Sequence, residues 1–186
     1  MIKITFLGAA QSVTGSRHLL EADGVRLLLD CGLFQERELT HRDWEPFPVD
    51  PATIDAVILT HAHLDHCGYL PRLVRQGFRG RIYCTPPTAE IARLTLLDSA
   101  ALQEEDAAYK KKRHLREKRA GRYPEEPLYT VNDAKNVIPR FQMHDYGETW
   151  RVNGAIAGVF RNSSHILGAS IVELAIKTGG AEKAFV

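Results

Sequence analysis

Short stretches rich in apolar, β-branched and aromatic residues alternate with turn-forming residues along most of the chain, and this pattern predicts strands. The dipeptide Asp23-Gly24 lies between two such stretches and predicts a tight antiparallel hairpin. Leu27, Leu28 and Leu29 are continuous, which is typical of a strand buried on both faces. We therefore expect strands over residues 2–7, 17–22, 25–30, 54–60, 81–84, 141–146, 149–152, 155–161 and 170–177, with a further strand beginning at residue 182.

Apolar residues recur at helical spacing in other parts of the chain. A helix is predicted from about Asp65 to Gln76, directly after the strand over residues 54–60. A longer helix is predicted to begin with Thr88 as its N-cap, and its pattern turns polar after about residue 104. A short helix is expected over residues 131–138. Strands and helices in this order predict an α/β fold with a mixed sheet and flanking helices.

Composition places the chain among ordinary globular proteins. It has 186 residues, which is enough for one domain with a real core, and a net charge of +1, which favours no partner by bulk charge. Three cysteines without framework spacing suit a reducing compartment. The chain shows no long apolar run and no signal-peptide pattern, so we expect a cytoplasmic protein without a membrane partner.

The densest group of candidate metal-binding residues follows the strand over residues 54–60, where His61, His63, Asp65 and His66 fall within six residues. Imidazole nitrogens and carboxylate oxygens are ligands that Zn²⁺ takes. At the end of an extended strand, His61 and His63 point to one side, whereas the other two donors lie where the chain turns into a helix. Four donors in two groups indicate two neighbouring metals. The competing interpretation is a polar turn capped by Asp65, with incidental histidines.

Two further residues could contribute to the same site. Asp30 ends a buried strand, where a carboxylate is costly unless it is paired, and we interpret it as the group that orients a metal-binding histidine. The alternative is an aspartate that caps its own turn. His165 lies in a loop of small residues between two strands, where it could reach the histidine cluster. His18 lies within a strand and is interpreted as a packed or exposed side chain.

One basic cluster follows the long predicted helix. This cluster has two possible interpretations. It could be a solvated helix face, or it could contact the backbone of a polyanion. The cluster consists of Lys110, Lys111, Lys112, Arg113, Arg116, Lys118, Arg119 and Arg122.

These motifs resemble the metallo-β-lactamase superfamily, in which His-x-His-x-Asp-His follows a buried strand. Asp30 matches the first motif of that family and His165 matches its third. The surrounding residues are similar to one branch, the β-CASP RNA-processing nucleases. The stretches that carry this likeness are Leu7-Gly8-Ala9-Ala10, Val13-Thr14-Gly15-Ser16, Leu29-Asp30-Cys31-Gly32 and His165-Ile166-Leu167-Gly168-Ala169.

The resemblance implies an αββα sandwich, two Zn²⁺ ions and hydrolysis of phosphodiester bonds in single-stranded RNA during RNA processing or decay. His61, His63 and His165 would hold one zinc. Asp65 and His66 would hold the second, and Asp65 would also orient the nucleophile. Asp30 would fix the tautomer of an imidazole. The basic cluster suits a polyanionic substrate such as RNA, although its charge does not distinguish RNA from DNA.

The sequence also departs from the family pattern. The further Gly-Asp motif, the helical β-CASP domain and the returning segment that completes the metal-binding domain do not occur within residues 1–186. We therefore expect residues 1–186 to form the amino-terminal part of a metallo-β-lactamase-like domain, with partial zinc occupancy and incomplete activity. An unfinished sheet edge could then support self-association. The alternatives are a hydrolase of a small ester, thioester or phosphoester, and a non-catalytic fragment or interaction module.

Overall fold

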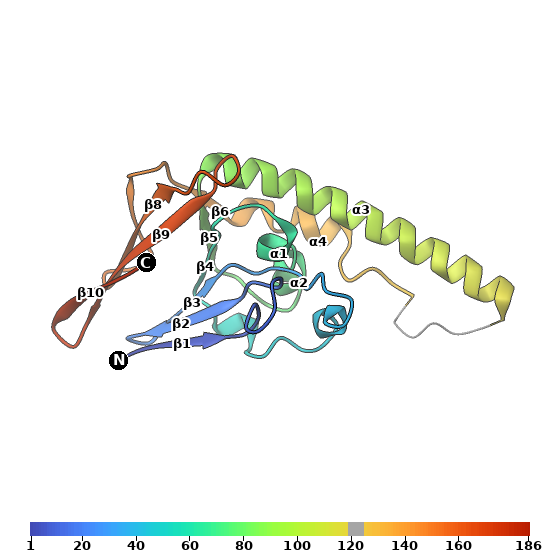
Figure 1. Ribbon diagram of the computed structural model, residues 1–186, viewed down its shortest axis with the longest axis horizontal. Coiled ribbons are helices and arrows are strands. Elements are labelled where there is room, and N and C mark those ends of the chain that lie inside the picture. Colours follow the sequence, from blue (N-terminus) through green and yellow to red (C-terminus); the bar gives the residue numbers. More distant parts are fainter. Residues whose placement is uncertain (119–124) are drawn as a thin grey trace.

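Two sheets pack face to face, and the helices cover the outer face of the first sheet, in a computed structural model that describes residues 1–118 and 125–186 (Figure 1). The first sheet has six strands in sequence order. They are β1 (Ile2–Phe6), β2 (His18–Ala22), β3 (Val25–Leu29), β4 (Ala56–Ile58), β5 (Arg81–Cys84) and β6 (Phe141–Met143). The second sheet is antiparallel in the order β10-β9-β8-β7. Its strands are β7 (Thr149–Arg151), β8 (Ile156–Asn162), β9 (Ser170–Thr178) and β10 (Ala181–Phe185).

The strand directions in the first sheet decide which loops, and therefore which polar side chains, can meet in one site. The predicted hairpin around Asp23-Gly24 is confirmed, because Ala22 pairs with Val25 at the end of β2 and β3. Strands β3, β4, β5 and β6 are parallel to one another. The segments that leave their carboxyl ends therefore meet at one edge of the sheet, which is where ligands bind in sheets of this kind.

The helix predicted over residues 65–76 is wrong as a single element. The structure has two short helices instead, α1 (Leu64–Cys67) and α2 (Leu70–Arg75). The backbone N–H of Tyr69 donates to the carbonyl of Cys31 at 2.9 Å, and Pro71 has no N–H to continue a helical ladder. A tertiary hydrogen bond and a proline thus divide a pattern that looked continuous.

The long helix is longer than its apolar pattern indicated. Helix α3 spans Pro86–Glu117, and its N-cap is Thr85, not Thr88. The prolines at residues 86 and 87 are tolerated because the first turn of a helix has no hydrogen-bonded N–H groups. Ala100, Ala107 and His114 are buried at a spacing of seven, so one face of α3 continues beyond residue 104 as alanine and histidine. A pattern based on large apolar residues misses this face.

The remaining elements are short. Helix α4 (Val131–Lys135) ends earlier than predicted, and the strand expected over residues 141–146 stops at Met143. The capping box of α4 is formed by Thr130 and Asp133. Three 3₁₀ helices complete the described chain: Thr40–Asp43, Pro51–Thr53 and Ile138–Arg140. In the part of the chain that the structure describes, no helix is both long and apolar enough to cross a membrane.

Two hydrophobic layers hold these elements together. One lies between the first sheet and the helices, and the other lies between the two sheets. In the second layer, the ring of Trp150 packs against Tyr83 and Phe160, with centroids 5.0 and 5.1 Å apart. A Cβ on Gly158 would lie 2.3 Å from the Trp150 ring, so the close packing requires glycine there. These contacts fix the second sheet on the first, in agreement with the predicted α/β class.

Candidate metal centre

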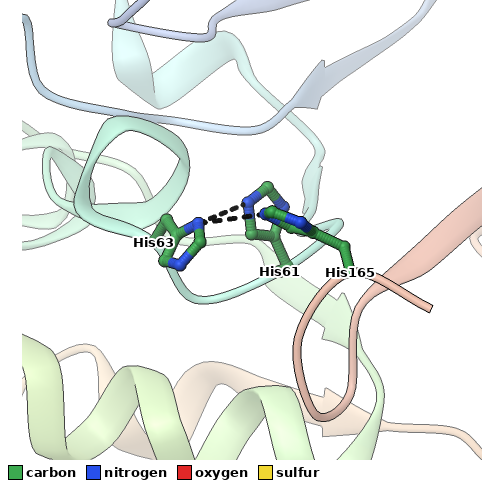
Figure 2. A group of neighbouring side chains, drawn as sticks. All are labelled: His61, His63 and His165. Carbon is green, nitrogen blue, oxygen red and sulfur yellow. Dashed lines mark hydrogen bonds between the residues drawn. The ribbon is translucent and has the colours of Figure 1, made fainter. Parts of the chain in front are cut away.

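Three histidines from two distant segments meet at the carboxyl edge of the first sheet (Figure 2). His61 and His63 follow β4, and His63 is the N-cap of α1. His165 comes from the loop between β8 and β9, 102 residues further along the chain than His63. His61 is buried, whereas His63 and His165 are exposed. The site is therefore open to solvent on one side.

The ring nitrogens of these three residues are spaced as ligands of one ion. His61 Nε2 lies 3.2 Å from His63 Nδ1, and His165 Nε2 lies 3.3 Å from the same atom. Zinc–nitrogen bonds of about 2.0–2.1 Å in tetrahedral geometry place two ligands about 3.3 Å apart. The donor set and its spacing therefore fit a divalent metal such as zinc.

The hydroxyl of Thr60 links His61 to Asp30. Thr60 Oγ1 lies 3.0 and 2.9 Å from the two Asp30 carboxylate oxygens and 3.0 Å from His61 Nδ1. Because a carboxylate only accepts, the hydroxyl donates to Asp30, and its oxygen is free to accept from His61 Nδ1–H. That tautomer leaves His61 Nε2 with a lone pair directed at the other two histidines.

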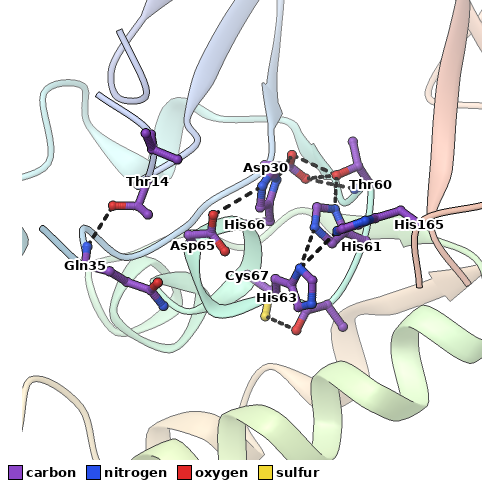
Figure 3. Close-up of polar contacts among 12 residues, drawn as sticks. Thr14, Asp30, Gln35, Thr60, His61, His63, Asp65, His66, Cys67 and His165 are labelled. Atoms are coloured by element: carbon purple, nitrogen blue, oxygen red, sulfur yellow. Dashed lines mark hydrogen bonds and ion pairs between the residues drawn. The ribbon is translucent and has the colours of Figure 1, made fainter. Parts of the chain in front are cut away.

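Asp30 also pairs directly with His66 (Figure 3). Asp30 is 4% exposed, and its carboxylate lies 2.7 Å from His66 Nδ1. His66 Nδ1–H donates to this carboxylate, so Nε2 carries the lone pair when the His66 ring is neutral, and it lies 3.5 Å from an oxygen of Asp65. Asp65 and His66 thus form a second donor pair beside the three histidines. Within residues 1–118 and 125–186, only the three histidines form a group of three or more metal donors.

Local electrostatics differ between His61 and His66. Burial, together with the charge of the neighbouring His66, lowers the pKa of His61 to about 4, so His61 is neutral near pH 7. Burial also lowers the pKa of His66, but the hydrogen bond and charge of Asp30, with the charge of Asp65, outweigh it and raise the pKa overall. A neutral imidazole is the form that binds a metal.

The loop that carries His165 is fastened to the start of α3. The carbonyl oxygen of Gly168 accepts hydrogen bonds from Thr85 Oγ1 at 2.7 Å and Thr88 Oγ1 at 2.8 Å. Gly168 has φ +86°, and a Cβ there would lie 2.5 Å from the backbone nitrogen of Thr88. The N–H of Ser170 donates to the carbonyl of Thr60 at 3.0 Å. His165 is therefore held relative to His61 by both α3 and the segment after β4.

Sequence reasoning missed the residues that support the donors. Thr60, Thr85 and Thr88 each place a hydroxyl between two segments of the site, and Tyr146 donates its hydroxyl to the Ala169 carbonyl at 2.9 Å. A threonine directly before His61 was the only available signal, because the other contacts join residues that are far apart in sequence.

Close backbone approach at Gly32 fixes the distance between the Asp30 turn and α1. A Cβ on Gly32 would lie 1.6 Å from the carbonyl oxygen of Asp65, and backbone atoms cannot move aside as a flexible side chain can. The N–H of Cys31 also donates to the His66 carbonyl at 2.7 Å. These contacts align Asp30 with His66.

We expect Gly32→Ala to lower the free energy of unfolding by about 1–3 kcal/mol, because the new methyl group forces the two backbone segments apart. Urea denaturation measures this change. The matched control is Gly154→Ala, since nothing lies within 4 Å of a Cβ at that exposed turn and its φ is not left-handed. Equal stability of the two variants would show that the close approach at Gly32 is not important.

The basic cluster lies away from the histidines. Its residues 110–117 belong to the end of α3 and Lys118 is the C-cap, while Arg119 and Arg122 lie outside the described residues. Arg113 is partly buried and Lys110 pairs with Asp106 at 2.5 Å. The exposed remainder consists of Lys111, Lys112, Arg116 and Lys118. The structure places these residues on one helix end but does not bring them to the histidine site.

Comparison with known proteins places these observations in a family. Residues 19–179 match the profile of the metallo-β-lactamase superfamily domain. A ribonuclease of Thermus thermophilus is 37% identical over 171 residues, covering 92% of this chain and 34% of the relative. The transcription termination factor FttA of Methanocaldococcus jannaschii is 34% identical over 181 residues, covering 96% of this chain and 26% of the relative. The chain thus spans about a third or less of the length of these relatives.

A solved structure gives the same picture of the fold. MEM-A1, a subclass B3 metallo-β-lactamase from a soil metagenome library, aligns over 97% of this chain and 58% of its own, with a TM-score of 0.55 and 16% identity. At this identity the likeness concerns the fold alone. It agrees with the two packed sheets and flanking helices described above.

Proposed function

Because the chain belongs to the metallo-β-lactamase superfamily, we propose that it is the amino-terminal part of a zinc-dependent ribonuclease acting on single-stranded RNA. The observation that carries this proposal is the convergence of His61, His63 and His165 at ligand spacing. Relatives named as a ribonuclease and as a transcription termination factor support the β-CASP nuclease branch and RNA as the substrate class. Residues 1–186 correspond to a minor share of those relatives, which supports a segment of a longer protein.

The roles of the residues follow from their contacts. His61, His63 and His165 would hold one zinc, and Asp65 with His66 would contribute to a second. When bound, two such ions supply a nucleophile from water near neutral pH and neutralise charge on the phosphoryl oxygens. Asp30 places the proton of the neutral His66 ring on Nδ1 directly, and it does the same for His61 through the hydroxyl of Thr60, so that Nε2 of each neutral ring carries the lone pair. Asp65 lies 3.5 Å from Nε2 of His66 and would orient the attacking water.

The second donor pair predicts incomplete zinc binding. Asp65 and His66 gain no third donor within the described residues, so we expect fewer than two tightly bound zinc ions per 186-residue chain. Metal analysis by mass spectrometry after dialysis against zinc-free buffer measures this number. Two fully occupied zinc ions per chain would show that residues assigned no role here complete the second site.

The test of the proposed function compares substrates. The full-length protein that contains residues 1–186 is incubated with zinc and either labelled single-stranded RNA or a small ester, thioester or phosphoester. We expect zinc-dependent cleavage of the RNA that a chelator abolishes. Turnover of the small compounds alone would replace the ribonuclease with a small-molecule hydrolase of the same fold. Neither activity, together with the absence of zinc, would indicate a non-catalytic module.

A further inference from the structure

Helix α3 joins two very different regions. Its first turn contacts the loop of His165 through Thr85 and Thr88, whereas its far end extends away from both sheets (Figure 1). The helix rises about 35 Å between Thr88 and Lys111. A molecule that reaches from the start of α3, where the His165 loop is fastened, to the far end of the helix must therefore be long.

Charge is segregated along the same helix. Residues 86–106 contain five acidic residues and one arginine, whereas residues 110–118 contain six lysines or arginines and one glutamate. Basic residues in the last turn of a helix stabilise the helix dipole, but this effect is confined to that turn. It therefore accounts for Arg116 and Lys118, and it does not account for Lys111 and Lys112.

The side chains of this end are available to a partner. Lys111, Lys112 and Arg116 are exposed, and no ion pair joins any of them to another residue in the described chain. Tyr109, Lys112 and Arg116 share one helix face, because Lys112 follows Tyr109 by three residues and Arg116 follows Lys112 by four. Tyr109 is 61% exposed, and the Arg113 guanidinium lies 5.9 Å from its ring centre. An exposed aromatic ring beside free cations is the arrangement that binds single-stranded nucleic acid, by base stacking and phosphate contact.

An anionic membrane is the other polyanion to consider. A helix that lies in a membrane surface presents a broad apolar face beside its basic residues. Between residues 107 and 118, Leu115 is the exposed aliphatic residue among the large hydrophobic side chains, and Ala107 is turned into the protein. This end of α3 therefore lacks the apolar face that membrane binding needs, and the chemistry favours RNA.

We propose that the end of α3, residues 109–118, is an RNA-docking arm that holds long single-stranded substrates at the far end of the helix, about 35 Å along its axis from Thr88. This inference rests on the proposed function for the choice of RNA. No hydrogen bond or ion pair joins the arm to the three histidines in the described part of the chain, so the arm contributes to the binding of long RNA and not to the reaction of short substrates.

The test compares two triple variants of equal charge change. The first is Lys111→Gln, Lys112→Gln and Arg116→Gln, and the control is Arg151→Gln, Lys177→Gln and Lys183→Gln on exposed positions of the second sheet. Binding of a long, unstructured, fluorescent RNA is measured by anisotropy, with a chelator present and at several salt concentrations. Thermal melting verifies that both variants are folded.

We expect the arm variant to bind long RNA at least about 10-fold more weakly at low salt, with a salt dependence shallower by about 2 in log–log slope, since each lost single-strand phosphate contact removes about 0.7. The control should match the unaltered protein. The docking proposal would be overturned by equal losses of RNA affinity in both variants or by an unchanged salt dependence. Binding of anionic vesicles without binding of RNA would also overturn it.

The chelator separates this inference from the proposed function, because binding is then measured without any reaction. Hydrolysis of a dinucleotide by the full-length protein provides the second readout, and the arm variant should leave its rate unchanged. An equal loss on the dinucleotide and on long RNA would overturn the docking role. If RNA is bound through the arm but no RNA is cleaved, the docking inference is supported and the ribonuclease proposal is contradicted.

Discussion

His63→Ala is expected to remove metal binding at the three-histidine site and, with it, zinc-dependent RNA cleavage by the full-length protein. His63 Nδ1 is the atom to which both other imidazoles are directed, at 3.2 and 3.3 Å. Without it, two histidines remain, and three protein ligands are the usual number for a catalytic zinc. The side chain is exposed, so the free energy of unfolding of the metal-free protein should change by less than about 0.5 kcal/mol.

Calorimetric titration with zinc and metal analysis measure the loss, and chemical denaturation verifies the fold. His41→Ala is the matched control, because His41 is an exposed histidine that contacts Glu45 and the carbonyl of Glu38, outside the site. If His63→Ala retained the zinc content of the His41→Ala variant, His63 would not be a ligand.

Asp30→Asn is expected to weaken zinc binding by about 10–100-fold, which is the usual cost of losing a carboxylate that orients metal-binding histidines. Asp30 has φ +58°, a left-handed backbone that asparagine tolerates almost as well as aspartate. The substitution therefore tests the carboxylate without straining the turn. The amide would present a donor to Thr60 or to His66, whose own N–H groups need an acceptor.

Zinc titration across pH measures the effect, and Asp98→Asn, at an exposed position of α3, provides the matched control. The weaker affinity should be accompanied by a changed pH dependence, because metal and proton then compete for imidazoles whose tautomers are no longer fixed. An affinity within about twofold of the control would mean that Asp30 serves only to cap its own turn.

The strand pattern and the histidine motif could be predicted because their signals are local. The hairpin depends on Asp23-Gly24, and the carboxyl-edge position of His61 and His63 depends on the buried strand directly before them. His165 was harder, since a single histidine in a loop carries little information, and its place beside His63 depends on how the two sheets pack. The upstream histidine cluster, which needs a further imidazole, suggested that connection, and the family resemblance agreed with it.

Features that depend on tertiary contacts could not be predicted from the sequence. The parallel pairing of β3 with β4 decides that the partner of Asp30 is His66, since both lie at the same end of those strands. The break between α1 and α2 depends on the hydrogen bond from Tyr69 to Cys31. The length of α3 depends on small buried residues such as Ala107, which a hydrophobic pattern does not register. In each case the contact that determines the structure joins residues outside the short stretch of sequence on which a prediction is based.

The central claim is that three imidazoles from two distant segments hold one divalent ion, and anomalous diffraction at the zinc edge from crystals of the zinc-loaded protein tests it most directly. We predict a strong anomalous peak about 2.0–2.1 Å from His61 Nε2, His63 Nδ1 and His165 Nε2. A crystal in which zinc is bound elsewhere, while these three nitrogens contact only one another or solvent, would contradict the account.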